Sequence, residues 1–79
     1  MKVELRVFSG LEKFMPHKRF GEPLGVELEN GSTIRDLLEK MGIPQDQVFT
    51  MLVDGRHQSF DYILNEGERV SFFPPVGGG

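Results

Sequence analysis

One stretch of the sequence has the full pattern of a helix, and it limits the folds open to the chain. Thr33 and Asp36 fit the capping box that starts a helix, and Lys40, Gly42 and Pro44 fit its end. The residues at helical spacing between them predict a single buried stripe: Ile34, Leu37, Leu38 and Met41. Because one helix covers only one face of a sheet, the chain is predicted to be a two-layer α+β domain.

Alternating apolar residues predict the strands that this helix covers. In residues 2–8, Val3, Leu5 and Val7 point to one side. Asp54-Gly55 is a strong hairpin turn. The expected strands are residues 2–8, 25–28, 48–54, 56–59 and 69–73. Residues 9–21 are expected to be irregular, with one short helical turn that includes Leu11. This order of elements is compatible with the last strand lying beside the first, in parallel.

Two phenylalanines stand apart from the buried set. Phe8 and Phe73 lie on the side of their strands opposite the core residues. If these strands are neighbours, the two rings are adjacent on the outer sheet face, and we include Phe60 as a third candidate. An exposed aromatic group is typical of a protein-docking patch. The alternative is that the loop of residues 9–21 folds over the rings and covers them.

Size and charge restrict the classes of function. With 79 residues the chain is one small domain with little room for an internal active site. It has no cysteine, which is compatible with a reducing cytosol, and no apolar run or leader pattern suggests a membrane. A net charge of −3 with scattered Lys and Arg makes nucleic acid and anionic membranes poor partners. We expect a cytoplasmic protein that binds a basic or apolar protein surface.

The end of the chain is the feature that suggests a function. After Phe73, Pro74 and Pro75 stop the last strand and favour a stiff, extended path. Val76 is then followed by three residues without a Cβ, which are Gly77, Gly78 and Gly79. We therefore predict a folded body over residues 1–75 and a flexible tail over 76–79. Such a tail can enter a narrow channel and deliver the α-carboxylate of Gly79. The alternative is an inert glycine linker.

Three segments together resemble the MoaD/ThiS family of sulfur carriers, and most of all the small subunits of molybdopterin synthases. They are residues 51–56, 64–70 and 72–79, which end in Phe-Phe-Pro-Pro and the terminal glycines. The resemblance implies a ubiquitin-like β-grasp, a mixed sheet of four to five strands with one main helix on one face and an extended C-terminal tail. The insertion at residues 9–21 and the Phe-Phe-Pro-Pro stem differ from the thiamin-type carriers.

The family's chemistry gives each part of the tail a role. The resemblance implies that an ATP-dependent adenylating enzyme activates Gly79, and that sulfur transfer then produces a thiocarboxylate there. A larger synthase subunit would receive the tail through Val76, Gly77 and Gly78, and would use the sulfur to build molybdopterin. Phe8, Phe60, Phe73, Pro74 and Pro75 are the predicted partner interface. The chain itself would be non-catalytic and would bind neither a metal nor a cofactor directly.

Other functions fit the same sequence. A ubiquitin-like modifier would join Gly79 to a lysine of a target protein, and a thiamin-type carrier would supply sulfur to a thiazole. A plain β-grasp interaction domain would have an inert tail. The sequence leaves open the sulfur acceptor, the sulfur donor, the oligomeric assembly and whether Gly79 is the native terminus. His17 and His57 lack a second ligand at metal spacing, so we interpret them as surface residues.

Overall fold

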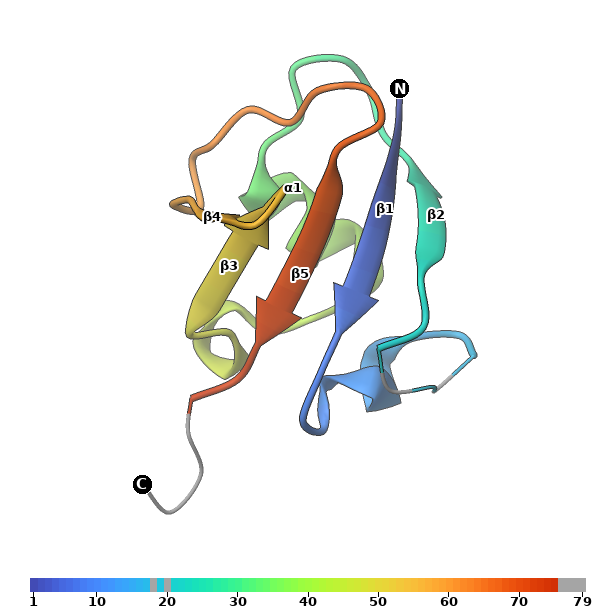
Figure 1. Ribbon diagram of the computed structural model, residues 1–79, viewed down its shortest axis with the longest axis vertical. Helices are drawn as coiled ribbons and strands as arrows, with labels where there is room; N and C mark the ends of the chain where they lie inside the picture. The colour runs from blue at the N-terminus through green and yellow to red at the C-terminus, as the bar shows by residue number, and fades with distance from the viewer. Residues whose placement is uncertain (18, 20, 76–79) are drawn as a thin grey trace.

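The computed structural model describes residues 1–17, 19 and 21–75, which form one sheet with one α-helix on one face (Figure 1). The strands are β1 (Lys2–Val7), β2 (Leu24–Glu27), β3 (Thr50–Val53), β4 (Arg56–His57) and β5 (Arg69–Phe73). The helix is α1 (Ile34–Met41), and two short 3₁₀ helices are η1 (Leu11–Phe14) and η2 (Gln45–Gln47). None of the helices in these residues is long and apolar enough to cross a membrane.

The five strands lie in the order β2-β1-β5-β3-β4, so the first and last strands form the centre of the sheet. β1 and β5 are parallel, with Leu5 opposite Val70 and Val7 opposite Phe72. β2 is antiparallel to β1, and β3 is antiparallel to both β5 and β4. The predicted parallel closure and the ubiquitin-like β-grasp are therefore confirmed.

Helix α1 begins and ends where the sequence predicts. The Oγ1 atom of Thr33 accepts a hydrogen bond from the Asp36 amide at 3.2 Å, and the Asp36 carboxylate accepts one from the Thr33 amide at 2.9 Å. These reciprocal bonds satisfy two amide groups that would otherwise lack partners at the helix start. Gly42 then takes the left-handed conformation that ends the helix, with φ of 71°.

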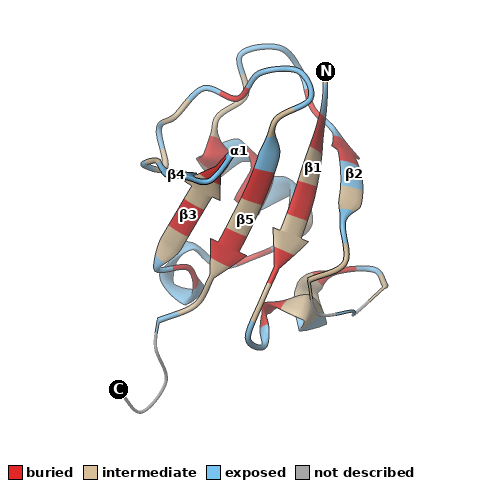
Figure 2. Ribbon diagram, in the orientation of Figure 1, coloured by how far each residue is buried: buried red, intermediate tan, exposed pale blue. Residues whose placement is uncertain are grey.

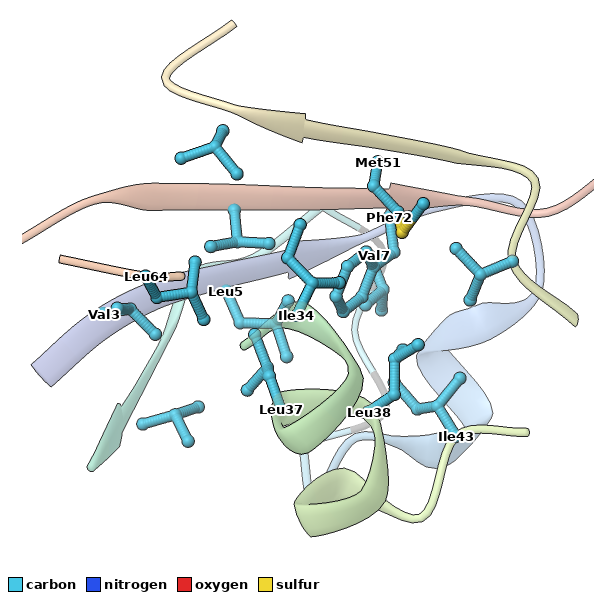
Figure 3. Packing of buried hydrophobic residues seen from close by; sticks show 14 of the residues in the cluster. Val3, Leu5, Val7, Ile34, Leu37, Leu38, Ile43, Met51, Leu64 and Phe72 are labelled. Atoms are coloured by element: carbon cyan, nitrogen blue, oxygen red, sulfur yellow. The ribbon is translucent and has the colours of Figure 1, made fainter. Parts of the chain in front are cut away.

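The core lies between α1 and the inner face of the sheet (Figure 3). Ile34, Leu37 and Leu38 of the predicted stripe are buried there, whereas Met41 in the last turn is half-buried. Buried and partly exposed residues alternate along β1 and β5 (Figure 2), as expected for strands covered on one side. Every side chain classed as buried in the described part of the chain is apolar.

Three of the predicted strands are shorter than the sequence suggests, β1 by one residue and β3 and β4 by more. β3 begins at Thr50 because η2 precedes it, so Val48 packs into the core before the strand pairing starts. β4 contains only Arg56 and His57, after a turn in which Asp54 and Gly55 both have positive φ. The irregular segment that follows β1 contains the expected short helical turn, η1, and its first residue, Leu11, is buried.

A hydrogen-bonded group fixes the loop that leads into β5. The Tyr62 hydroxyl donates to Glu68 at 2.6 Å, and the other oxygen of Glu68 accepts from the Asn65 amide at 2.6 Å. The hydrogen bond to Glu68 raises the pKa of Tyr62, and desolvation and the negative charge of Glu68 act in the same direction. The loop thus carries a bond that holds only while Tyr62 is protonated.

Thr33→Ala removes the side-chain half of the capping box, so we expect it to lower the free energy of unfolding by about 1 kcal/mol. Urea unfolding followed by circular dichroism measures the change. Ser32→Ala is the matched control, because no side-chain hydrogen bond of Ser32 occurs among the described residues. Equal midpoints for the two variants would contradict this role of Thr33.

The phenol of Tyr62 should titrate above the ordinary value of about 10, because its protonated form is held by Glu68. Tyr62 is the only tyrosine in the chain, so phenolate absorbance reports it alone. Any stability gained from this bond is present below pH 10 and is lost as the pH rises through the raised pKa. Glu68→Gln should move the midpoint down, and an unchanged midpoint would exclude Glu68 as the cause.

Candidate functional site

Because β1 and β5 are parallel, they end at the same edge of the sheet (Figure 1). An aromatic residue stands at each of these ends. Phe8 follows β1 and Phe73 is the last residue of β5. Their rings are stacked, with 4.7 Å between centroids and an interplanar angle of 7°. The Phe8 amide also donates to the Phe72 carbonyl at 3.2 Å, which extends the pairing by one residue. The predicted adjacency of these rings is confirmed.

Alternation along β5 explains why this pair lies outside the core. Phe72 points inward and is fully buried, so Phe73 must point to the outer face, where it is half-buried. Pro74 is half-buried and Pro75 is exposed, so the chain leaves the body at this edge. Residues 76–79 lie outside the described residues. The roles predicted for Val76, Gly77, Gly78 and Gly79 therefore stay predictions.

The loop between β1 and β2 covers part of this site. The Gly21 amide donates to the Val7 carbonyl at 2.9 Å, which brings the returning chain against Phe8. A Cβ atom at Gly21 would lie 3.0 Å from the Phe8 ring, and Gly21 has φ of +68°, so glycine suits this position on both grounds. Phe8 and Phe73 both remain half-buried. The loop thus packs against Phe8 but leaves part of the pair accessible.

Phe60 does not lie with the stacked pair. Its carbonyl accepts a hydrogen bond from the Arg35 amide at 3.0 Å, and the Arg35 guanidinium lies 5.8 Å from the Phe60 ring centroid. These contacts place it at the start of α1, where it packs partly against the core. The reason is that the chain before β5 runs along the helix start, as the bridge between Thr33 and Ile63 shows. The prediction that grouped Phe60 with Phe8 and Phe73 is therefore corrected.

Phe49 is the aromatic residue that sequence reasoning missed. Its side chain is 71% exposed, and its amide donates to the Phe73 carbonyl at 2.9 Å. A third aromatic residue therefore stands at the edge where the tail leaves. Val48 and Met51 are three residues apart, so in one alternating strand they would face opposite sides, yet both are buried. The spacing of these two apolar residues was the available signal. We define the tail-side patch as Phe8, Phe49, Phe73, Pro74 and Pro75.

The described residues contain no group of three or more His, Cys, Asp or Glu side chains that could hold a metal ion. His17 contacts the Glu22 carbonyl at 3.2 Å and accepts from the Arg19 amide at 2.9 Å, whereas His57 is exposed on β4. Asp61 forms an ion pair with Arg35. The polar groups in this part of the chain thus support loops and turns, and the site that stands out is the tail-side patch.

Solved structures of other small proteins share this fold. SAMP1 from Haloferax volcanii is 19% identical, with 100% of each chain covered and a TM-score of 0.72. A putative molybdopterin converting factor subunit 1 from Pyrococcus furiosus is 24% identical, covering 96% of this chain and 99% of that one, with a TM-score of 0.72. At these identities the similarity shows the fold. No curated protein matches the sequence.

A third similar structure is a complex of subunits 1 and 2 of molybdopterin-converting factor from Helicobacter pylori 26695. It is 21% identical, with 100% of each chain covered and a TM-score of 0.62. The predicted resemblance to ubiquitin-like MoaD/ThiS proteins is thus confirmed in the fold. The Mut7-C ubiquitin family matches residues 1–77, which is nearly the whole chain. The chain belongs to the Mut7-C ubiquitin family.

Proposed function

We propose that this protein is a sulfur carrier whose C-terminal Gly79 becomes a thiocarboxylate, and that it donates this sulfur in molybdopterin biosynthesis. One observation carries the proposal: β5 ends at the edge of the sheet where Phe8 and Phe73 stack, so the chain leaves the sheet beside this pair. A small body with little room for an internal active site thus releases its chain, after Pro75, beside a surface suited to protein docking. The fold shared with subunit 1 of molybdopterin-converting factors supports it.

The chemistry requires activation by another protein. A terminal carboxylate has a pKa of about 3.5, so at neutral pH it is ionised and is a poor electrophile. An oxygen of the Gly79 carboxylate would attack the α-phosphorus of ATP, and pyrophosphate would leave. A hydrosulfide-equivalent donor would then add to the acyl carbon. The carbon–oxygen bond to AMP would break, and a carbon–sulfur bond would remain at Gly79.

This division of labour assigns binding, and not catalysis, to the body of the carrier. An adenylating enzyme would bind ATP and stabilise the charge that develops during activation. A larger synthase subunit would receive the tail, in the cytoplasm, and position the sulfur against its acceptor. The tail-side patch is suited to dock such partners, because it surrounds the point where the chain leaves the sheet.

A protein modifier is the second candidate, and one similarity favours it. The small archaeal modifier protein 1 of Haloferax volcanii shares the fold, with 18% identity and a TM-score of 0.73. A modifier would use the same activated Gly79 but would pass the acyl group to a lysine amine. A carrier that supplies thiazole sulfur is a variant of the first proposal.

Mass spectrometry of the chain isolated from cells separates the two candidates. An N-terminally tagged chain that keeps Gly79 should gain the mass difference between sulfur and oxygen on its C-terminal peptide. A chain that lacks Gly79 is the control and should gain nothing. A ladder of larger species on gels, each with a lysine joined to Gly79, would favour the modifier. Full function in cells without Gly79 would contradict both.

Phe73→Ala should weaken binding to the partner by about 2 kcal/mol, roughly 30-fold, because it removes half of the stacked pair. Calorimetry with the adenylating enzyme or the synthase subunit measures the change, and circular dichroism checks the fold. Ile63→Ala is the matched control, because Ile63 is also exposed but pairs with Thr33 next to α1. Equal affinities of both variants and the original chain would remove the patch from the interface.

A further inference from the structure

A hollow lies on the outer face of the sheet, apart from the tail-side patch. Its volume is about 280 Å³, and it is lined by Arg6, Asp54, Gly55, Arg69 and Ser71. These residues come from the two central strands and from the turn between β3 and β4. The face is the one turned away from α1, and it is seen from the front in Figure 1. The hollow therefore belongs to the surface that a docking partner can reach.

Strand register brings the polar groups together. Arg6 on β1 is directly opposite Ser71 on β5, and Glu4 is opposite Arg69. Residues opposite one another share a face of the sheet, so Arg6, Arg69 and Ser71 all project outward. Two residues further along each strand, the next outward positions are Phe8 and Phe73, whose rings stack. The polar hollow and the stacked aromatic pair are thus consecutive steps along the same two strands.

The donors in the hollow are only partly used by the protein. The Nε atom of Arg6 is buried and has no hydrogen-bond partner among the described residues. Its Nη2 atom contacts Glu4 at 3.5 Å, which is longer than a charged hydrogen bond normally is. The side chains of Arg69 and Ser71 make no hydrogen bond or ion pair within the described part of the chain. The guanidinium of Arg69, the hydroxyl of Ser71 and the terminal nitrogens of Arg6, whose side chain is 41% exposed, therefore remain available to a ligand.

The surrounding backbone holds this arrangement in place. The Asp54 carboxylate accepts a hydrogen bond from the Arg69 amide at 2.9 Å, and the Asp54 amide donates to the Arg69 carbonyl at 2.8 Å. These bonds attach the β3–β4 turn to β5 beside the hollow. Asp54 and Glu4 also supply two negative charges, which formally balance the charges of the two arginines. A singly charged anion is therefore favoured over a divalent one.

We propose that this hollow binds a carboxylate, and that in the cell the carboxylate is an Asp or Glu side chain of the protein that docks on the tail-side patch. The planar guanidinium fork matches a carboxylate with two parallel hydrogen bonds, and an arginine stays charged at any physiological pH. A carboxylate seated next to Phe8 and Phe73 sets the orientation of the partner relative to the outgoing tail. The identity of the partner rests on the proposed function, whereas carboxylate binding does not.

The test is an NMR titration of the ¹⁵N-labelled chain with sodium acetate, with sodium chloride replaced to keep ionic strength constant. The Arg6 Nε–H signal and the Ser71 amide signal are the readouts. Saturable shifts of both signals are expected with acetate, and sodium phosphate should bind more weakly. Arg69→Gln should weaken acetate binding about ten-fold. Arg56→Gln, the same charge change on the edge strand β4 and outside the hollow lining, should leave it unchanged.

Three results would overturn the proposal. Shifts that do not saturate, or that chloride reproduces, would show that no carboxylate site exists. Tighter binding of phosphate than of acetate would assign the hollow to a phosphate group instead. Equal losses in Arg69→Gln and Arg56→Gln would show a general attraction of anions to the sheet. The titration works equally in a chain without Gly79, so its failure leaves the sulfur-carrier proposal standing, and the reverse also holds.

Discussion

The parallel pairing of β1 with β5 is the interaction on which the other features of this structure depend. It joins the first strand of the chain to the last, so the body is closed only when both are in register. Inside, it sets Leu5 opposite Val70 and Val7 opposite Phe72, all of them completely buried. A slip of one residue would turn these side chains to solvent and the polar ones inward. The buried alternation therefore specifies the register strongly.

The same register also determines which side chains are neighbours on the outer face of the sheet. It places Arg6 beside Ser71, and then Phe8 beside Phe73 at the edge where the chain leaves. Stability comes from the inner side of the pair, which is covered by α1, whereas the outer side is where we propose that a partner docks. Substitutions on the outer face can therefore change partner choice at little cost to the fold. This separation is a direct result of the two-residue period of a strand.

Features set by short-range chemistry could be read from the sequence, and those set by register could not. The capping box of Thr33 and Asp36, the left-handed Gly42 and the last strand at residues 69–73 depend on neighbouring residues and appear as predicted. The strand order needed the family resemblance. The local sequence does not show that the chain before β5 follows the helix start, which is why Phe60 was misplaced.

Phe49 and the hollow are two more features whose positions depend on how the strands pair. Phe49 reaches the tail-side edge because η2 shifts the start of β3, and the sequence signals this only by the spacing of Val48 and Met51. Arg6, Arg69 and Ser71 are up to 65 residues apart in the chain, so only the pairing of β1 with β5 reveals them as one group. The sequence thus predicted Phe8 and Phe73 as one pair, whereas Phe49 and the hollow became visible only in the sheet.

The glycine end explains why recognition must depend on the folded body. Gly77, Gly78 and Gly79 have no side chains, so an enzyme that accepts this tail can measure its length and width but little else. Any other protein ending in glycines offers the same shape and the same carboxylate. Under the proposed function, an activating enzyme would therefore have to distinguish carriers by contacts outside the tail. The stacked pair lies at the edge where the chain leaves the sheet, and the two arginines lie on the same face further back along β1 and β5. Under the proposed function, these residues would supply the apolar and charged contacts on which such a choice depends.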